Sequence, residues 1–458
     1  MGKQPHVLAI PLPAQGHVGP LLKLATKIAE HGVKVTFVNT EFIEAKIMAS
    51  MPEISAIGGS LIEFVSVPDG LEHGDIERDF EKSRNIMKKV MPGKLKELIE
   101  KINQVSDDQQ ISCVIGDVNA QWGLEVAQKL GIPSAAFVTY GPAILALQFH
   151  ITKLIDDGVI DADGTALKDG LISISEGNLP WKFDEFPWMV RGQGKIQKII
   201  FESSIEVVEC VKMSNWVLSN SVYELDASSC DLVPNILPIG SLLASNNSRF
   251  LAGSFRPEDS SCLSWLDEKP IGSVVYVALG SSTILNQAQF DELAIGLESS
   301  GQSFLWVVRP DILWGPVAIF PDGFKKRIAG RGKIVEWAPQ EKVLAHSSVA
   351  CFVSHCGWNS TLEGLTMGVP FLCWPFFVDQ YQNSRYICEA WKIGFELTRD
   401  DHGIVTRHEI QAKITKLFNE ESIKGNALKL KEKATNSLAE GGSSYKNFQR
   451  FIAEIKFS

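Results

Sequence analysis

The motifs that mark the commonest disulfide, metal and nucleotide sites are absent from this 458-residue sequence. Its eight cysteines form no CxxC pair, and its nine histidines form no HExxH or other metal-ligand spacing. No P-loop occurs, and no glycine-rich stretch completes the dinucleotide-binding fingerprint. In a chain of this length the cysteines are expected to be small buried hydrophobes and not a disulfide framework. We expect neither a bound metal nor a cofactor.

Long apolar runs and an excess of basic residues are also missing. The first apolar stretch leads to Gly16 after about eight residues, whereas a membrane span needs about 20. No secretory cleavage site follows that stretch. The formal net charge is −10, which argues against a general nucleic-acid binder with a basic face. We therefore expect a cytoplasmic protein with no nucleic-acid partner and no stable membrane insertion.

The first half of the chain alternates apolar, β-branched runs with helical patterns. Such runs are typical of parallel strands that helices cover on both faces. The expected strands are 7–12, 33–40, 61–68, 111–117 and 133–139, and the expected helices are 19–31, 82–105, 119–130 and 141–154. This alternation predicts βαβ units and an open parallel sheet.

The second half repeats the pattern after a polar stretch at 241–262 that reads as a linker. The expected strands are 273–281, 303–310, 333–339, 349–355 and 370–376, with helices at 286–301 and after Gln340, Asn359 and Gln380. The sequence thus predicts an α/β protein of two doubly wound domains. Such sheets bind ligands at the carboxyl ends of their strands, and two facing domains would form a cleft there.

One stretch, HCGWNSTLEGLTMGVP, places polar side chains at the junction of a strand and a helix. His355 ends the strand, and Gly357, Asn359 or Ser360 opens the helix, whose free N–H groups suit a diphosphate. Glu363 lies three residues after Ser360, as in a capping box, or accepts hydrogen bonds from a ribose diol. The alternative is a capped helix packed on a strand with a core histidine.

Three other strand ends carry candidate groups. LGSST places Ser281 and Thr283 after an apolar strand, where glycine and hydroxyls suit a phosphate. His17 follows the first strand in PLPAQGHVGP, and Asp117 ends the strand ISCVIGD. A carboxylate that bonds the second imidazole nitrogen would fix the tautomer of the histidine and stabilise its imidazolium. The alternatives are a structural histidine and an N-cap for the helix after Asp117.

Two further features have simpler interpretations. Asp161 and Asp163 form a DxD pattern, which can bind a metal–diphosphate complex, but it lies in a turn-rich polar loop. The aromatic segment 178–192 either lines a binding pocket or packs against its own domain.

The 44-residue window from Trp337 to Gln380 resembles the signature box of plant family 1 UDP-glycosyltransferases along its whole length. The resemblance also covers the QGH start, the strand-end aspartate and the GGSS segment at 441–444. It further covers the GS loop, LGSST at 279–283, in which Leu279 replaces the usual Phe. It implies the GT-B fold, with facing Rossmann-like domains at 1–240 and 263–442 and a final helix at about 443–458 that returns to the first domain. The first would bind the acceptor and the second the UDP-sugar.

The resemblance also implies roles for individual residues. In the family, the box binds the UDP-sugar and the QGH histidine is the catalytic base with the strand-end aspartate, which places the dyad on His17 and Asp117. For the uracil and ribose, the matching positions are Trp337, Ala338, Gln340 and Glu363. For the diphosphate they are His355, Asn359, Ser360, Ser281 as first choice and Thr283 as second, with Gly357 beside them. For the sugar hydroxyls they are Trp358, Asp379 and Gln380.

The expected reaction is inverting, metal-independent transfer of glucose from UDP-glucose to a hydroxyl or carboxyl of a small lipophilic plant metabolite. Gln380 resembles the glucose users of the family, although UDP-xylose or another UDP-sugar remains open. Two alternatives stay open: a UDP-sugar-binding regulatory protein without turnover, and a GT-B-fold sugar-nucleotide epimerase. Nothing in the sequence demands more than a monomer.

Overall fold

The computed structural model describes residues 4–50, 61–71, 80–105, 110–190, 194–243, 256–313 and 318–457. Its contacts divide the chain into two units. The first unit is Met1–Arg256 with Asn436–Ser458, and the second is Pro257–Thr435. Most of the predicted linker, residues 244–255, lies outside the described residues.

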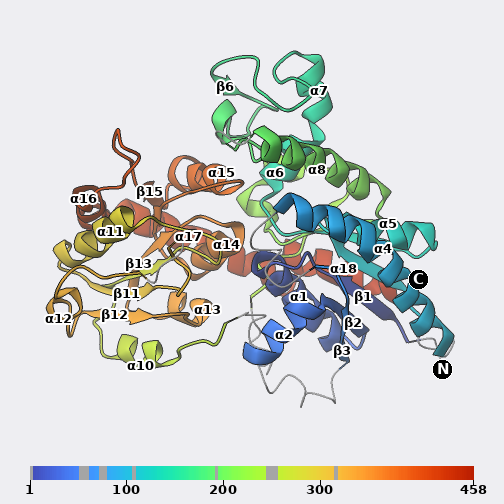
Figure 1. Ribbon diagram of the computed structural model, residues 1–458, viewed down its shortest axis with the longest axis horizontal. Helices are drawn as coiled ribbons and strands as arrows, with labels where there is room; N and C mark the ends of the chain where they lie inside the picture. The colour runs from blue at the N-terminus through green and yellow to red at the C-terminus, as the bar shows by residue number, and fades with distance from the viewer. Residues whose placement is uncertain are drawn as a thin grey trace. The chain divides into compact units, whose positions relative to one another are not determined.

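The first unit is built on a seven-stranded parallel sheet of order β3-β2-β1-β4-β5-β8-β9 (Figure 1). Its strands are β1 (His6–Ile10), β2 (Lys34–Thr40), β3 (Ile62–Val67), β4 (Cys113–Asp117), β5 (Ser134–Val138), β8 (Trp216–Ser219) and β9 (Ile236–Pro238). The five predicted strands of the first half are confirmed. The sequence reading missed β8 and β9, which are short.

Helices cover both faces of this sheet, because alternate residues of each strand point to opposite sides. In β1, Val7 and Ala9 join the core under α1 and α18, whereas Leu8 and Ile10 join the core under α4 and α5. The helices are α1 (Gln15–Glu30), α2 (Glu41–Ser50), α4 (Phe80–Val105), α5 (Gln121–Lys129), α6 (Pro142–Phe149), α7 (Ile151–Asp156), α8 (Gly194–Met213), α9 (Ala227–Cys230) and α18 (Ser443–Phe457), with short 3₁₀ turns η3 (Phe183–Glu185) and η4 (Tyr223–Leu225). A small antiparallel pair, β6 (Leu171–Ile172) and β7 (Trp181–Lys182), lies between α7 and α8 in the chain.

The second unit has a six-stranded parallel sheet of order β12-β11-β10-β13-β14-β15 (Figure 1). Its strands are β10 (Val274–Ala278), β11 (Ser303–Val307), β12 (Gly332–Val335), β13 (Val349–Ser354), β14 (Phe371–Cys373) and β15 (Gly394–Glu396). The helices are α10 (Ser261–Asp267), α11 (Gln287–Ser299), α12 (Phe324–Arg327), α13 (Gln340–Leu344), α14 (Trp358–Met367), α15 (Gln380–Arg385), the π-helical turn η5 (Tyr386–Ala390), α16 (Arg407–Phe418) and α17 (Glu421–Leu438). All five predicted strands are confirmed, and β15 was missed.

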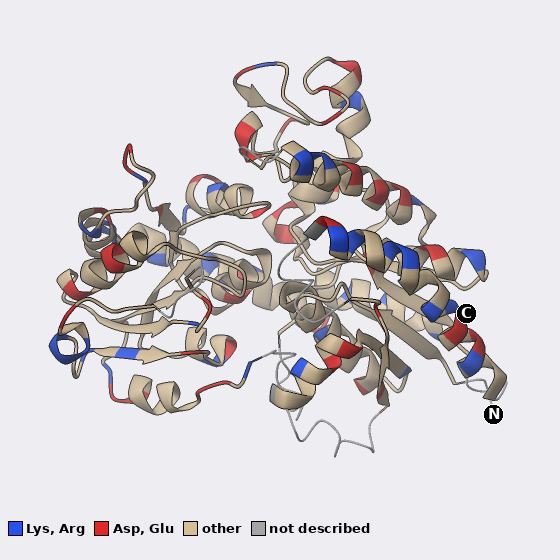
Figure 2. Ribbon diagram, viewed as in Figure 1, with Lys and Arg blue, Asp and Glu red and all other residues tan. Residues whose placement is uncertain are grey.

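Acidic and basic residues are interspersed over both units (Figure 2). Some of them form ion pairs between elements. Arg84 of α4 bonds Glu206 of α8 at 2.7 Å, and Lys195 of α8 pairs with Glu81 of α4 at 2.7 Å. All eight cysteines are free thiols, seven of them buried, as predicted. Within the part of the chain that the structure describes, no helix has the length and apolar character that a membrane crossing requires.

The last helix belongs to the core of the first unit. Phe448 and Phe451 of α18 are fully buried beside β1, β2 and β8, and the ring of Phe451 meets that of Trp216 edge-on at 5.5 Å between centroids. The Trp216 indole N–H also donates to Glu454. The helix is therefore an integral part of this unit, although it follows the second unit in the chain.

Phe451→Ala is expected to lower the free energy of unfolding of the first unit by about 3–5 kcal/mol, because it removes a fully buried ring and leaves a cavity. Phe457, on the same helix, is 92% exposed, so Phe457→Ala is the matched control and should change stability by less than about 0.5 kcal/mol. Urea unfolding monitored by tryptophan fluorescence measures both. Equal stability of the two variants would contradict the assignment of α18 to this core.

Candidate active site

His17 and Asp117 meet at the carboxyl ends of β1 and β4, which are neighbours in the sheet. Nδ1 of His17 lies 2.7 Å from Oδ2 of Asp117. The carboxylate is completely buried, while the imidazole remains 23% exposed. A buried carboxylate in this position stabilises the tautomer in which Nδ1 carries the proton, so that Nε2 is the basic nitrogen.

Two further groups fix this pair. Oδ1 of Asp117 accepts the backbone N–H of Asn119 at 2.8 Å, so each carboxylate oxygen has its own partner. The hydroxyl of Thr139, just after β5, lies 3.0 Å from Nδ1 of His17. The N-cap interpretation of Asp117 is wrong, since α5 is capped by Ala120 without a side-chain hydrogen bond. Sequence reasoning missed Thr139, although its place as the last residue of a predicted strand was a usable signal.

The helix that carries His17 begins earlier than predicted. Helix α1 starts at Gln15, and its Pro20 lies inside the helix. The predicted range, 19–31, started the helix too late and would put this proline in the first turn, where its missing N–H costs nothing. His17 is consequently held on the first turn of a helix and not in a loop.

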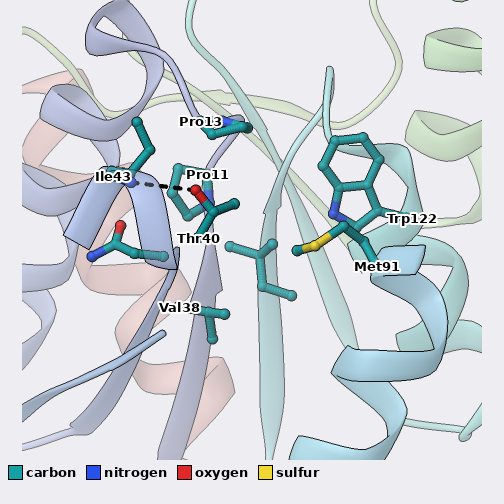
Figure 3. Close-up of a pocket in the computed structure, with 9 residues that line it drawn as sticks. Pro11, Pro13, Val38, Thr40, Ile43, Met91 and Trp122 are labelled. Carbon is teal, nitrogen blue, oxygen red and sulfur yellow. Dashed lines mark hydrogen bonds between the residues drawn. The ribbon is translucent and has the colours of Figure 1, made fainter. Parts of the chain in front are cut away.

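A small pocket opens at the ends of β1 and β2, beside the segment that leads to α1 (Figure 3). In Figure 3, Pro11, Thr40 and Ile43 lie opposite Met91 and Trp122 across it. Most of the lining is apolar. Trp122 Nε1 is buried without a hydrogen-bond partner among the described residues. The lining is therefore mainly apolar, and the indole N–H of Trp122 is a donor in it that has no partner among the described residues.

In the second unit, β13 and α14 form the strand–helix junction that the sequence predicted. Of the three possible openings, the helix begins at Trp358 with Gly357 as its N-cap. Cys356 turns the chain with φ of 65°, a left-handed conformation. The capping box is wrong, because Ser360 lies inside the helix and its Oγ accepts from Gln340 Nε2 at 2.8 Å.

The imidazole of His355 lies between two glycines, Gly280 of the loop after β10 and Gly357. Burial, and secondarily the positive charge of Arg309, lower the pKa of His355 to about 4. The ring is therefore neutral at pH 7 and acts as a hydrogen-bonding group, not as a cation. Its Nδ1 is buried and finds no partner within the described part of the chain.

Gly280→Ala should disrupt this arrangement, since a methyl group there would collide with Nε2 of His355. Gly280 also has φ of 71°, where alanine costs roughly 1–2 kcal/mol. Gly272→Ala is the matched control, because φ is 64° there and no atom lies within 4 Å of the added carbon. Both variants should lose similar backbone stability, and only Gly280→Ala should also weaken the UDP binding that the family resemblance implies for this loop, by about tenfold or more, in titration calorimetry. Unchanged UDP affinity would contradict the placement of His355.

Gln340, at the start of α13, is hydrogen-bonded to two other predicted donor-site residues, Ser360 and Glu363. Its Nε2 donates to Ser360 Oγ at 2.8 Å and to Glu363 Oε2 at 2.7 Å, and its Oε1 accepts from the Tyr276 hydroxyl at 3.2 Å. These bonds orient Glu363, whose carboxylate has further lone pairs for a ribose diol. In this structure Gln340 therefore positions Ser360 and Glu363.

Asp379 and Gln380 start α15, the next helix of the box. Gln380 Oε1 accepts the N–H groups of Phe376 and Phe377 at 2.9 and 3.3 Å, which fixes the plane of the amide. Asn383 donates to Asp379 Oδ2 at 2.8 Å and to the Cys356 carbonyl at 2.9 Å. Asn383, which sequence reasoning missed, thus ties α15 to the turn before α14.

The remaining predicted residues differ in exposure. Ala338 and Trp358 are buried, and Trp337 and Asn359 are half-buried. Ser281 is half-buried, whereas Thr283 is buried and its Oγ1 has no partner among the described residues. The second unit thus brings the GS loop, His355 and the start of α14 together. Gln340 bonds Ser360 and Glu363, and Asn383 links Asp379 to the turn at Cys356, just before α14.

The two secondary features have structural roles. Asp161 Oδ1 accepts the N–H groups of Asp163 and Thr165, which closes a turn, and Asp163 pairs with Lys198 at 2.9 Å. In the aromatic segment, Phe186 and Trp188 are buried and stack at 5.0 Å between centroids. Packing is therefore the role of these two rings, while residues 191 and 192 lie outside the described part. Among the described residues, no three His, Cys, Asp or Glu side chains are grouped to hold a metal ion.

Comparisons with known proteins agree on one family. The model of the family described as "UDP-glucoronosyl and UDP-glucosyl transferase" matches residues 26–435. The chain is 42% identical to UDP-glycosyltransferase 83A1 of Arabidopsis thaliana, over 100% of this chain and 97% of the relative. It is 34% identical to a 7-deoxyloganetin glucosyltransferase of Catharanthus roseus, over 99% and 97%.

Solved structures agree with the fold. A UDP-glucosyltransferase from Polygonum tinctorium that glucosylates indoxyl, solved with 3,4-dichloroaniline, has a TM-score of 0.83 at 27% identity over 99% of both chains. Os79 from O. sativa, solved with UDP, has a TM-score of 0.82 at 27% identity over 98% of this chain and 100% of its own. These neighbours have the GT-B fold, which confirms the predicted fold class.

Proposed function

The chain belongs to the plant family 1 UDP-glycosyltransferases, which transfer a sugar from a UDP-sugar to a small plant metabolite, and on this premise we propose that it is an inverting glucosyltransferase. His17 is the proposed base and UDP-glucose the proposed donor. The observation that carries the proposal is the 2.7 Å contact between His17 Nδ1 and the buried Asp117 carboxylate. A protein that only bound UDP-sugars would need no such pair.

In the proposed reaction, Nε2 of His17 takes the proton from an acceptor hydroxyl, and the oxygen attacks the anomeric carbon. Asp117 stabilises the imidazolium that forms. The bond from that carbon to the diphosphate oxygen breaks, and UDP leaves with its charge met by hydrogen bonds from the GS loop and the start of α14. Because His355 is neutral, it contributes a hydrogen bond and no full charge.

The proposed donor contacts follow the described geometry. Glu363, held by Gln340, would bind the ribose, with Trp337 and Ala338 on the uracil. Ser281, Thr283, Asn359 and Ser360 would bind the diphosphate. Gln380, Asp379 and Trp358 would bind the sugar, and the fixed amide of Gln380 supports glucose, as in the family's glucose users.

The acceptor remains open beyond its class. One relative is a 7-deoxyloganetin glucosyltransferase and one structural neighbour glucosylates indoxyl, which supports a small plant metabolite as the acceptor here.

The test is mass spectrometry of the purified protein with UDP-glucose, UDP-xylose or UDP-galactose and a panel of hydroxylated and carboxylated acceptors, with EDTA present. The proposal expects a product heavier by one hexose from UDP-glucose, with a β linkage by NMR, since inversion converts the α configuration of the donor. A donor altered without acceptor would indicate the epimerase, and a requirement for metal would refute the metal-independent mechanism. Donor binding with no product from any acceptor would favour a regulatory protein.

A further inference from the structure

Arg309 is a buried cation directly beneath the GS loop. It follows β11, the neighbour of β10 in the sheet, and is 2% exposed. Its guanidinium donates to the carbonyl oxygens of Gly280 and of Thr283, the latter at 2.6 Å. Its Nε donates to Asp311 at 3.0 Å, on the exposed side. Two of its bonds therefore hold the loop that the proposed function places on the diphosphate.

These bonds determine which way the loop presents its N–H groups. In a planar trans peptide the C=O and N–H bonds point in opposite directions. When Arg309 binds the Gly280 carbonyl, the N–H of the next residue, Ser281, points away from the guanidinium. The same holds for the N–H of Ile284 after Thr283. Arg309 thus holds the carbonyl groups of Gly280 and Thr283 toward its guanidinium, and the N–H groups of Ser281 and Ile284 point away from it.

The same loop is also attached to the segment after Arg309. The N–H of Leu285 donates to the carbonyl of Ile312 at 2.8 Å, and Leu285 forms a β-bridge with Leu313. Gly280 in turn lies against the imidazole of His355. The loop is therefore fixed at both ends, with Arg309 bound between them and with a positive charge beneath its backbone.

Burial of an arginine costs free energy, and two neutral carbonyls together with the solvent-exposed carboxylate of Asp311 repay it only in part. A hydrophobic residue could fill the same space without this cost, so we look for a functional role of the positive charge of Arg309. A diphosphate carries negative charge, and a fixed cation behind the loop attracts it without direct contact. The lowered pKa of His355 is consistent with this field, since Arg309 is one of its two causes.

We infer that Arg309 is a positioning residue of the donor site, which holds the GS loop so that its donors face the diphosphate. The inference rests on the proposed function, because it assumes that this loop binds a UDP-sugar. Arg309 acts through the loop and its field, and not by contact with the sugar nucleotide.

The experiment compares wild type with Arg309→Met, Arg309→Lys and Arg327→Met. Arg327, in the same unit, also bonds a carboxylate and a carbonyl, but it is 46% exposed, which makes it the matched control. Calorimetry gives the Kd for UDP-glucose without acceptor, and kinetics with the acceptor found above give KM for each substrate. Thermal denaturation reports on folding.

Arg309→Met is expected to raise the Kd and the KM for UDP-glucose by about 10- to 100-fold, the loss that one or two charge-assisted hydrogen bonds correspond to. The KM for the acceptor should stay unchanged. Arg309→Lys keeps the charge but not the two-pronged geometry, so it should fall between Met and wild type. Arg327→Met should match wild type.

Wild-type affinity for UDP-glucose in a folded Arg309→Met protein would overturn the inference. An equal rise in the KM for UDP-glucose and the KM for the acceptor would also overturn it. If Arg309→Met does not fold, Arg309→Lys decides: reduced affinity for UDP-glucose supports the inference, and wild-type affinity overturns it. Failure of wild type itself to bind UDP-glucose would instead refute the proposed function, and the inference with it.

Discussion

His17→Ala is expected to lower kcat for glycosyl transfer by about 10²- to 10⁴-fold while the Kd for UDP stays almost unchanged. The imidazole lies in the first unit on the first turn of α1, whereas every residue assigned to UDP lies in the second unit. Its loss removes the base for the acceptor proton and no predicted contact to the nucleotide. Single-turnover kinetics and calorimetry with UDP measure the two quantities separately.

His31 is the matched control for this variant. It is the C-cap of the same helix, is half-buried, and bonds the Lys27 carbonyl at 2.9 Å. His31→Ala should retain catalysis even if it lowers stability. A His17→Ala protein that is folded but has lost most of its UDP affinity would assign His17 to donor binding and not to base catalysis.

Asp117→Asn should be nearly as damaging, by about 10²-fold or more in kcat, although the change is nearly isosteric. The Asn119 N–H requires an acceptor at the Oδ1 position, so the new amide keeps its oxygen there. Its NH₂ group then faces Nδ1 of His17, where the wild type has an acceptor. The imidazole is driven to the other tautomer, in which Nε2 carries a proton and cannot accept one.

Asp226→Asn provides the comparison. Asp226 is also buried, and its Oδ1 accepts the Ser229 N–H at 3.3 Å as the cap of α9. Asparagine caps helices as well as aspartate does, so activity and stability should both be kept. Product formation assayed by chromatography distinguishes the variants. Wild-type turnover in Asp117→Asn would show that Asp117 has only a structural role.

The ten predicted strands were readable because short, mainly apolar runs alternate with helical patterns along the chain. The strands missed in the two large sheets are short: β8 has four residues, and β9 (ILP) and β15 (GFE) have three each and contain a proline or a glycine that disfavours strands. Sheet order was equally hidden. That β1 lies next to β4, and so His17 next to Asp117, follows from the topology of the sheet. The strand-end positions suggested the pairing as one possibility, and the family resemblance assigned it.

The donor site was predicted residue by residue from that resemblance, but its supporting contacts were not. The first residue of α14 was uncertain because Cys356 adopts a left-handed backbone conformation, which a cysteine does not indicate in a sequence. Arg309 and Asn383 act through backbone carbonyls. A hydrogen bond from a side chain to a backbone carbonyl cannot be predicted from residue types or their spacing, since every residue has the same carbonyl group.

The place of α18 has a consequence for the order of events during synthesis. Domains generally fold as units as they leave the ribosome, the earlier one first. Here the core of the first unit needs Phe448 and Phe451, which are translated only after the whole of the second unit. The second unit can thus complete its fold while the first unit still exposes the apolar surface that α18 later covers. We expect a chaperone to be needed longest at this exposed surface of the first unit.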